Sequence, residues 1–336
     1  MKRAILHVGT HKTGTTSIQS FLSSHAEELK RSGIYFPSGG KHSLGDGTQT
    51  SGHQRVPWGL IEGDDSALVD VLDECARADA PCIVISSEEL ELLHDRPQQV
   101  RRLRERLTDA GYDVTVVAYL REQPGYLESM YSEMMKRVRF MRFSEFLDGA
   151  LRDGAVAVHP HYPVTLRYGT FIANWAAGFG PDAVVARPYD ARSPAALIPD
   201  FLQTVAALSC HAEPVEGRQE PLQNRRMTLG QLVVQLHWFA TQLRGAVADP
   251  IAAVNYAGTT QHDPILGEPF AALRYEDRVS ILEQFSGENA RAERAAGIRI
   301  PGTRLDDIPP RDDARWAIAA RQRAIVDAVT DFWFAD

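Results

Sequence analysis

The sequence predicts an α/β fold of three layers, with a mainly parallel central sheet of about five strands and a helical C-terminal part. Two observations support this fold. Short apolar runs alternate with segments of helical periodicity over the first two thirds of the chain, a pattern typical of a parallel sheet with helices on both faces. In addition, the first run, 4–8, leads through a glycine-containing loop directly into a helix.

The expected strands are short and apolar, as buried parallel strands are. They are predicted at 4–8, 34–36, 82–86, 114–119 and 183–187. The expected helices share apolar residues at helical spacing. They are predicted at 15–31, 65–78, 98–110, 124–138, 164–177 and 194–208. The segment 37–56 has no periodicity and is expected to form a long functional loop.

These elements divide the chain into a core and an extension. We expect residues 1–210 to form the ligand-binding core. We expect residues 211–336 to form a helical C-terminal extension that packs on the same domain. A chain of 336 residues is long enough for one large α/β domain with such an appended part.

The composition excludes several classes of function. The formal net charge of −8 argues against bulk nucleic-acid binding, which needs a basic face. No stretch approaches the ~20 apolar residues of a membrane span. The three cysteines have a spacing that suits neither zinc nor a redox pair. We therefore expect a cytoplasmic protein without a nucleic-acid partner, and the sequence indicates no oligomeric state.

The loop that follows the first strand, Gly9–Thr16, has the spacing of a phosphate cradle. Its two glycines are separated by four residues, and a helix begins directly after them, so backbone N–H groups and a helix N-terminus can hold a polyanion. A nucleotide kinase carries its lysine directly after the second glycine. Here Thr15 occupies that position and Lys12 lies inside the loop. The loop predicts a P-loop-like fold that binds a phosphate other than a β,γ-diphosphate.

The segment Gly9–Gln19, GTHKTGTTSIQ, resembles the 5′-phosphosulfate loop of sulfotransferases that use 3′-phosphoadenosine 5′-phosphosulfate (PAPS), above all the bacterial and carbohydrate-type branch. The resemblance covers roughly residues 4–208. It implies PAPS as the co-substrate, 3′,5′-ADP (PAP) as the product, and no metal. The residues that it implies for the 5′-phosphosulfate are Lys12, Thr13, Gly14, Thr15, Thr16 and Ser17. Lys12 would also stabilise the bridging oxygen as it acquires charge.

A second motif follows the fourth predicted strand. Arg121 is placed where that strand ends, and Ser129 falls on the second turn of the next helix. A guanidinium and a hydroxyl eight residues apart can reach one phosphate, to which arginine donates in a bidentate manner. The pair resembles the 3′-phosphate site of the same family. Because ATP has no 3′-phosphate, this motif distinguishes PAPS from ATP.

Transfer to a hydroxyl acceptor requires a base close to the acceptor oxygen. We predict His53, in the loop after the second strand, as the first candidate and His42 as the second. Glu88, just after the third strand, is the third candidate, although it can instead cap the following helix. The acceptor is expected to be a carbohydrate or another small molecule.

Two alternatives remain open at this point. One is a P-loop kinase that uses ATP and Mg²⁺, which the displaced Lys12 argues against. The other is a catalytically silent module that binds PAP, which the three candidate bases argue against. The segment Asn224–Arg226 is basic and could close over the donor, but a solvated turn is the simpler interpretation.

Overall fold

The computed structural model describes residues 2–43, 49–135, 141–159, 162–209, 227–244 and 250–334. The chain forms two compact units. The first unit comprises Met1–Arg121, Arg167–Asn224 and Gly287–Pro301. The second comprises Glu122–Leu166, Arg225–Ser286 and Gly302–Asp336. The predicted boundary between residues 210 and 211 lies outside the described residues, and the division into core and extension stays a prediction.

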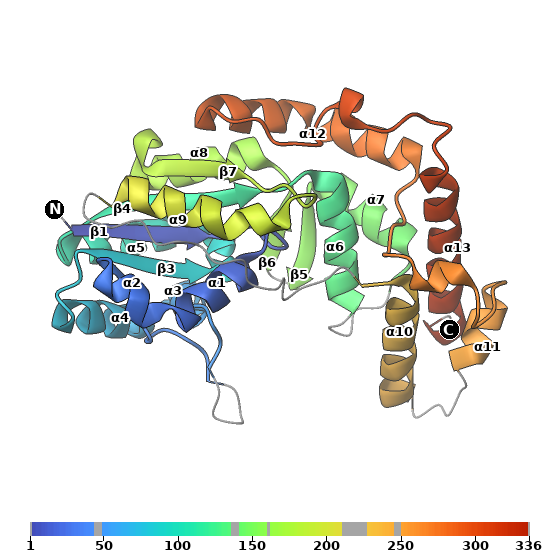
Figure 1. Cartoon of the computed structure of the whole chain (residues 1–336), viewed down its shortest axis with the longest axis horizontal. Helices are drawn as coiled ribbons and strands as arrows, with labels where there is room; N and C mark the ends of the chain where they lie inside the picture. Colours follow the sequence, from blue (N-terminus) through green and yellow to red (C-terminus); the bar gives the residue numbers. More distant parts are fainter. Residues whose placement is uncertain are drawn as a thin grey trace. The chain divides into compact units, whose positions relative to one another are not determined.

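The first unit is built around a parallel sheet of five strands (Figure 1). Their spatial order is β2 (Ile34–Tyr35), β3 (Cys82–Ser87), β1 (Lys2–Val8), β4 (Tyr112–Leu120) and β7 (Val184–Pro188). All neighbouring strands run parallel. This confirms the predicted α/β fold. Because β1 lies between β3 and β4, the segments that follow these three strands meet at one edge of the sheet, where α/β folds bind their ligands.

The helices of the first unit connect the strands and cover the sheet. They are α1 (Thr15–Ser24), α2 (Ala26–Arg31), α3 (Arg55–Glu62), α4 (Ser66–Arg77), α5 (Pro97–Asp109), α8 (Tyr168–Phe179) and α9 (Leu197–Leu208). Three 3₁₀ turns accompany them: η1 (Glu88–Leu93), η2 (Pro181–Ala183) and η3 (Pro194–Ala196). The helix predicted at 15–31 is divided into α1 and α2, because the chain leaves helical geometry at His25.

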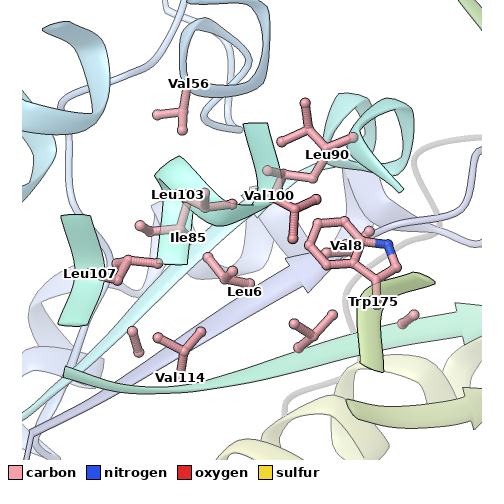
Figure 2. Packing of buried hydrophobic residues seen from close by; sticks show 14 of the residues in the cluster. Leu6, Val8, Val56, Ile85, Leu90, Val100, Leu103, Leu107, Val114 and Trp175 are labelled. Atoms are coloured by element: carbon pink, nitrogen blue, oxygen red, sulfur yellow. The ribbon is translucent and has the colours of Figure 1, made fainter. Parts of the chain in front are cut away.

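Two hydrophobic clusters lie on opposite faces of this sheet, as the alternation of side chains along a strand requires. Leu6 and Val8 of β1 belong to one cluster, together with side chains of α3, α4, α5 and α8. Ile5 belongs to the other, together with side chains of α1 and α9. Figure 2 shows Leu6 and Val8 among their neighbours, with Trp175 of α8 packed beside them. The sheet is therefore the buried middle layer of three.

The second unit is mainly helical. Its helices are α6 (Gln123–Met135), α7 (Phe143–Asp153), α10 (Leu229–Arg244), α11 (Pro250–Tyr256), α12 (Tyr275–Ala296, whose last residues belong to the first unit) and α13 (Arg315–Phe334). Two 3₁₀ turns are η4 (Pro264–Gly267) and η5 (Leu305–Asp307). The antiparallel ribbon of β5 (Ala155–His159) and β6 (Tyr162–Thr165) was not predicted.

The predicted helical C-terminal part is confirmed by α10 to α13. Within the described ranges, no helix is long and apolar enough to cross a membrane.

Candidate active site

The loop between β1 and α1 is held in a defined conformation by its own threonines. The backbone at Lys12 has a φ of 62°, in the left-handed region that side chains other than glycine rarely adopt. The hydroxyl of Thr10 donates to the carbonyl of Tyr119 at 2.7 Å, and the hydroxyl of Thr13 donates to the carbonyl of Thr10 at 2.6 Å. Such a backbone costs on the order of 1 kcal/mol or more and persists only where its surroundings fix it.

The two glycines of the loop are required by close approaches. A Cβ atom on Gly9 would lie 2.2 Å from Oγ1 of Thr15. A Cβ atom on Gly14 would lie 2.3 Å from Cδ2 of Leu197, and the φ of Gly14 is +82°. No larger residue fits at either position without displacing a neighbour. The spacing that predicted the loop therefore has a steric cause.

The N-terminus of α1 opens onto this loop. Gly14 is its N-cap residue, and a glycine has no side chain that could provide a cap hydrogen bond. The first N–H groups of a helix carry partial positive charge and are suited to bind an anion. Thr15 is buried, and its Oγ1 has no hydrogen-bond partner among the described residues. Thr16 is exposed and Ser17 is half-buried.

Arg121 brings a second cation to the loop from the end of β4. Its Nη1 atom donates to the carbonyl oxygen of Lys12 at 3.0 Å. The guanidinium carbon lies 5.8 Å from the centre of the Tyr189 ring. Arg121 is buried, and its Nε has no hydrogen-bond partner in the part of the chain that the structure describes. The structure thus brings together Lys12 and Arg121, which are 109 residues apart in sequence.

Ser129, the predicted partner of Arg121, lies half-buried in α6 of the second unit. Its neighbour Glu128 is fully buried and anchors this helix. One oxygen of Glu128 accepts from the backbone N–H groups of Ala272 and Leu273, at 2.9 and 3.1 Å, and the other accepts from Arg278 at 3.3 Å. This anchor was not predicted from the sequence. The shared contact of Arg121 and Ser129 with a phosphate stays a prediction.

His53 is placed in the interior of the first unit. Its exposed fraction is 0%. Its Nδ1 lies 3.1 Å from the backbone N–H of Ser86, from which it can accept, and its Nε2 lies 3.0 Å from the carbonyl oxygen of Pro37, to which it can donate. With both nitrogens bonded to the backbone, the ring fastens the long loop to β3. Its role as a base stays a prediction, and this arrangement does not favour it.

The other two candidate bases lie at different places. His42 is exposed in the long loop, where its backbone bonds to Thr50. Glu88 is half-buried in the first turn of η1, directly after β3. Glu88 is the one carboxylate among the three candidates. It lies at the same edge of the sheet as the phosphate loop. The segment Asn224–Arg226 lies outside the described residues.

Two buried histidines of the first unit are expected to make the fold sensitive to acid. Burial is the main cause that lowers the pKa of His7 to about 3 and that of His53 to about 4. The ordinary pKa is 6.5, so the unfolded chain binds protons that the folded chain does not. The contribution of His7 and His53 to the free energy of unfolding should be highest above pH 6.5. It should fall from there towards pH 4, by on the order of 1–3 kcal/mol for each histidine.

Urea denaturation at about pH 7.5 and about pH 5 measures this effect. Wild type should lose stability over this interval, and His53→Gln should lose less. The matched control is His262→Gln, at an exposed histidine, which should follow wild type. An equal loss in wild type and in His53→Gln would show that His53 is not the group that titrates.

A histidine and a glutamate that the sequence analysis did not single out form a pair beside the loop. Oε2 of Glu91 accepts from the backbone N–H of His11 at 2.9 Å and lies 2.8 Å from Nδ1 of its ring. Burial alone would lower the pKa of His11. The hydrogen bond to Glu91 and the charges of Glu88, Glu91 and Glu89 outweigh burial and raise that pKa to about 9. These interactions favour the protonated, cationic form of the imidazole.

The comparisons with known proteins add one likeness in fold. No family model and no curated protein matches the chain. Among solved structures, the chain is similar to the crystal structure of a sulfotransferase from Alicyclobacillus acidocaldarius. The two share 14% sequence identity and a TM-score of 0.47, over 90% of this chain and 99% of the other.

Proposed function

We propose that this protein is a sulfotransferase that moves the sulfuryl group of PAPS to a hydroxyl acceptor and releases PAP. The observation that carries the proposal is the buried guanidinium of Arg121, bonded to the carbonyl of Lys12. A guanidinium at this place can bind a phosphate separate from those held by the loop N–H groups. PAPS has a separate 3′-phosphate, and the Arg121 Nε has no partner among the described residues.

The residues of the loop also fit the proposed donor, because they can hold its 5′-phosphosulfate. The uncapped N-terminus of α1 and the buried hydroxyl of Thr15 supply donors, as does the exposed hydroxyl of Thr16. We assign the 5′-phosphosulfate to Lys12, Thr13, Gly14, Thr15, Thr16 and Ser17. We assign the 3′-phosphate to Arg121 and Ser129.

In the proposed reaction, the acceptor oxygen forms a bond to sulfur while the bond from sulfur to the 5′-phosphate oxygen breaks. Lys12 stabilises the negative charge that develops on the leaving oxygen. The acceptor gives its proton to a base of the protein. Lys12, Arg121 and the loop N–H groups supply the positive charge that metal ions supply in phosphoryl transfer, so the proposal includes no metal.

Glu88 is the base that the geometry favours. It stands at the first turn of η1, on the same edge of the sheet as the phosphate loop. In His53, by contrast, both ring nitrogens bond to the backbone. We propose a carbohydrate or small-metabolite hydroxyl as the acceptor, with the loop 37–56 contributing to its pocket.

The experiment that tests the proposal is a thermal shift assay with PAP, ADP and ATP, each with and without Mg²⁺. A ligand at about 100 times its Kd should stabilise the protein by about 2.7 kcal/mol. We expect PAP to stabilise the protein more than ADP or ATP, without any need for magnesium. A magnesium-dependent preference for ATP would instead establish the kinase alternative.

A second measurement separates an enzyme from a silent module that binds PAP. The protein is incubated with PAPS and a panel of sugars and small alcohols, and the formation of PAP is followed. Acceptor-dependent release of PAP is expected, and Glu88→Gln should slow it. Tight binding of PAP with no turnover on any acceptor would favour the silent module.

A further inference from the structure

The pair formed by His11 and Glu91 is largely buried and lies beside the phosphate loop. The side chain of Glu91 is 0% exposed and that of His11 is 12% exposed. Two donors of His11, its backbone N–H and its ring Nδ1, converge on a single oxygen of Glu91. The other oxygen of Glu91 is buried and has no hydrogen-bond partner within the described ranges. A buried carboxylate with one unpaired oxygen is stabilised by a positive partner, and His11 supplies it.

The pair also fixes which ring nitrogen of His11 faces outward. Because Nδ1 is bonded to Glu91, Nε2 is the nitrogen left for a further partner. A carboxylate that holds one nitrogen of a histidine sets the orientation of the ring and the chemistry of the other nitrogen. In the cationic form, Nε2 carries a proton and can donate to an anion.

The order of the strands decides which part of the donor His11 can reach. Arg121 follows β4, on one side of β1, whereas Glu91 follows β3, on the other side. In the loop, the carbonyl of Lys12 accepts from Arg121, and the preceding residue, His11, bonds to Glu91. Suppose that Arg121, on the β4 side of the loop, binds the 3′-phosphate of the adenosine. The part of the loop next to β3 then lies towards the other end of the PAPS molecule. That end carries the sulfuryl group, and Glu88 stands on the same side.

We propose that His11 is a cationic ligand within the loop, in addition to Lys12 and Arg121, and that Glu91 orients it. The Nε2 hydrogen of His11 binds an oxygen of the sulfuryl group and not the phosphates of the nucleotide. This inference rests on the proposed function. It makes His11 a residue that distinguishes PAPS from PAP, and Glu91 a positioning residue. The groups that face His11 are Glu88, Glu89 and Glu91 from η1, with Lys12 next to it in the loop.

The test compares two dissociation constants in each protein, that of PAPS without an acceptor and that of PAP, by isothermal titration calorimetry. In His11→Gln the Kd of PAPS should rise about tenfold, because a charged hydrogen bond is lost, and the Kd of PAP should change little. Glu91→Gln should have the same effect in weaker form. The matched control, His262→Gln at an exposed histidine, should leave both constants unchanged.

A measurement on the wild-type protein keeps the test independent of how the variants fold. With ¹⁵N-labelled histidine, nuclear magnetic resonance reports the pKa of His11 from its ring nitrogens. That pKa should lie near 9 in the free protein. It should rise further with PAPS, and less with PAP.

The outcomes distinguish the two proposals. Equal weakening of PAPS and PAP in His11→Gln, or a His11 resonance that responds equally to both ligands, would overturn the role of His11 and leave the sulfotransferase proposal intact. Failure of the wild type to bind either nucleotide would overturn both.

Discussion

Replacing Lys12 with methionine is expected to lower the turnover of PAPS by about a hundredfold to a thousandfold, the range found when one donor to a developing negative charge is removed. Methionine keeps the length and much of the packing of the side chain and removes its charge. The φ of 62° at this position strains the backbone for lysine and methionine alike. The substitution therefore adds no backbone strain. The variant should therefore fold, and its loss should be chemical.

Whether Lys12→Met lowers mainly kcat or mainly the affinity for PAP identifies the role of Lys12. If its ammonium group acts mainly on the bridging oxygen as the bond breaks, kcat should fall far more than the affinity for PAP. The measurements are the initial rate of PAP formation at saturating PAPS and the Kd of PAP. Lys30→Met changes an exposed lysine in the same way and should keep wild-type values. A loss of affinity for PAP as large as the loss of kcat would make Lys12 a binding residue only.

The strands of the first unit could be predicted from the sequence because burial on both faces makes them continuous apolar runs. The phosphate loop could be predicted because sterics dictate its glycines, as Gly9 and Gly14 show. The ribbon of β5 and β6 was missed, since residues 164–165 were assigned to a helix that begins at Tyr168. Local periodicity does not show which two segments will pair across a turn.

The polar residues of the site were harder to predict from the sequence than the strands and the phosphate loop. His53 and Glu91 lie in segments with no distinctive periodicity, and the burial of each depends on distant segments of the chain. His53 is fixed by the backbone of Ser86 and Pro37, and Glu91 by His11. Glu91 did leave a signal, because it stands among the leucines of the 3₁₀ turn Glu88–Leu93, where an acidic residue needs a buried partner. The partner itself could come only from the fold.

Replacing Arg121 with methionine is expected to weaken the binding of PAP by about a hundredfold, since hydrogen bonds from a buried guanidinium to a phosphate are among the strongest in proteins. The affinity for ADP, which has no 3′-phosphate, should change much less. Arg121→Lys should restore only part of the loss, because an ammonium group cannot donate in the planar, forked geometry of arginine.

The loss of a structural bond must be separated from the loss of a ligand contact, because Arg121 also donates to the carbonyl of Lys12. Arg104 provides the matched control, since it is an exposed arginine that donates to the carbonyl of Gly178 at 3.0 Å. Arg104→Met should leave both affinities unchanged. The decisive quantity is the ratio of the Kd of PAP to that of ADP, because damage to the loop alone raises both constants together. An unchanged ratio in Arg121→Met would remove the 3′-phosphate from this site and, with it, the main reason to choose PAPS over ATP as the donor.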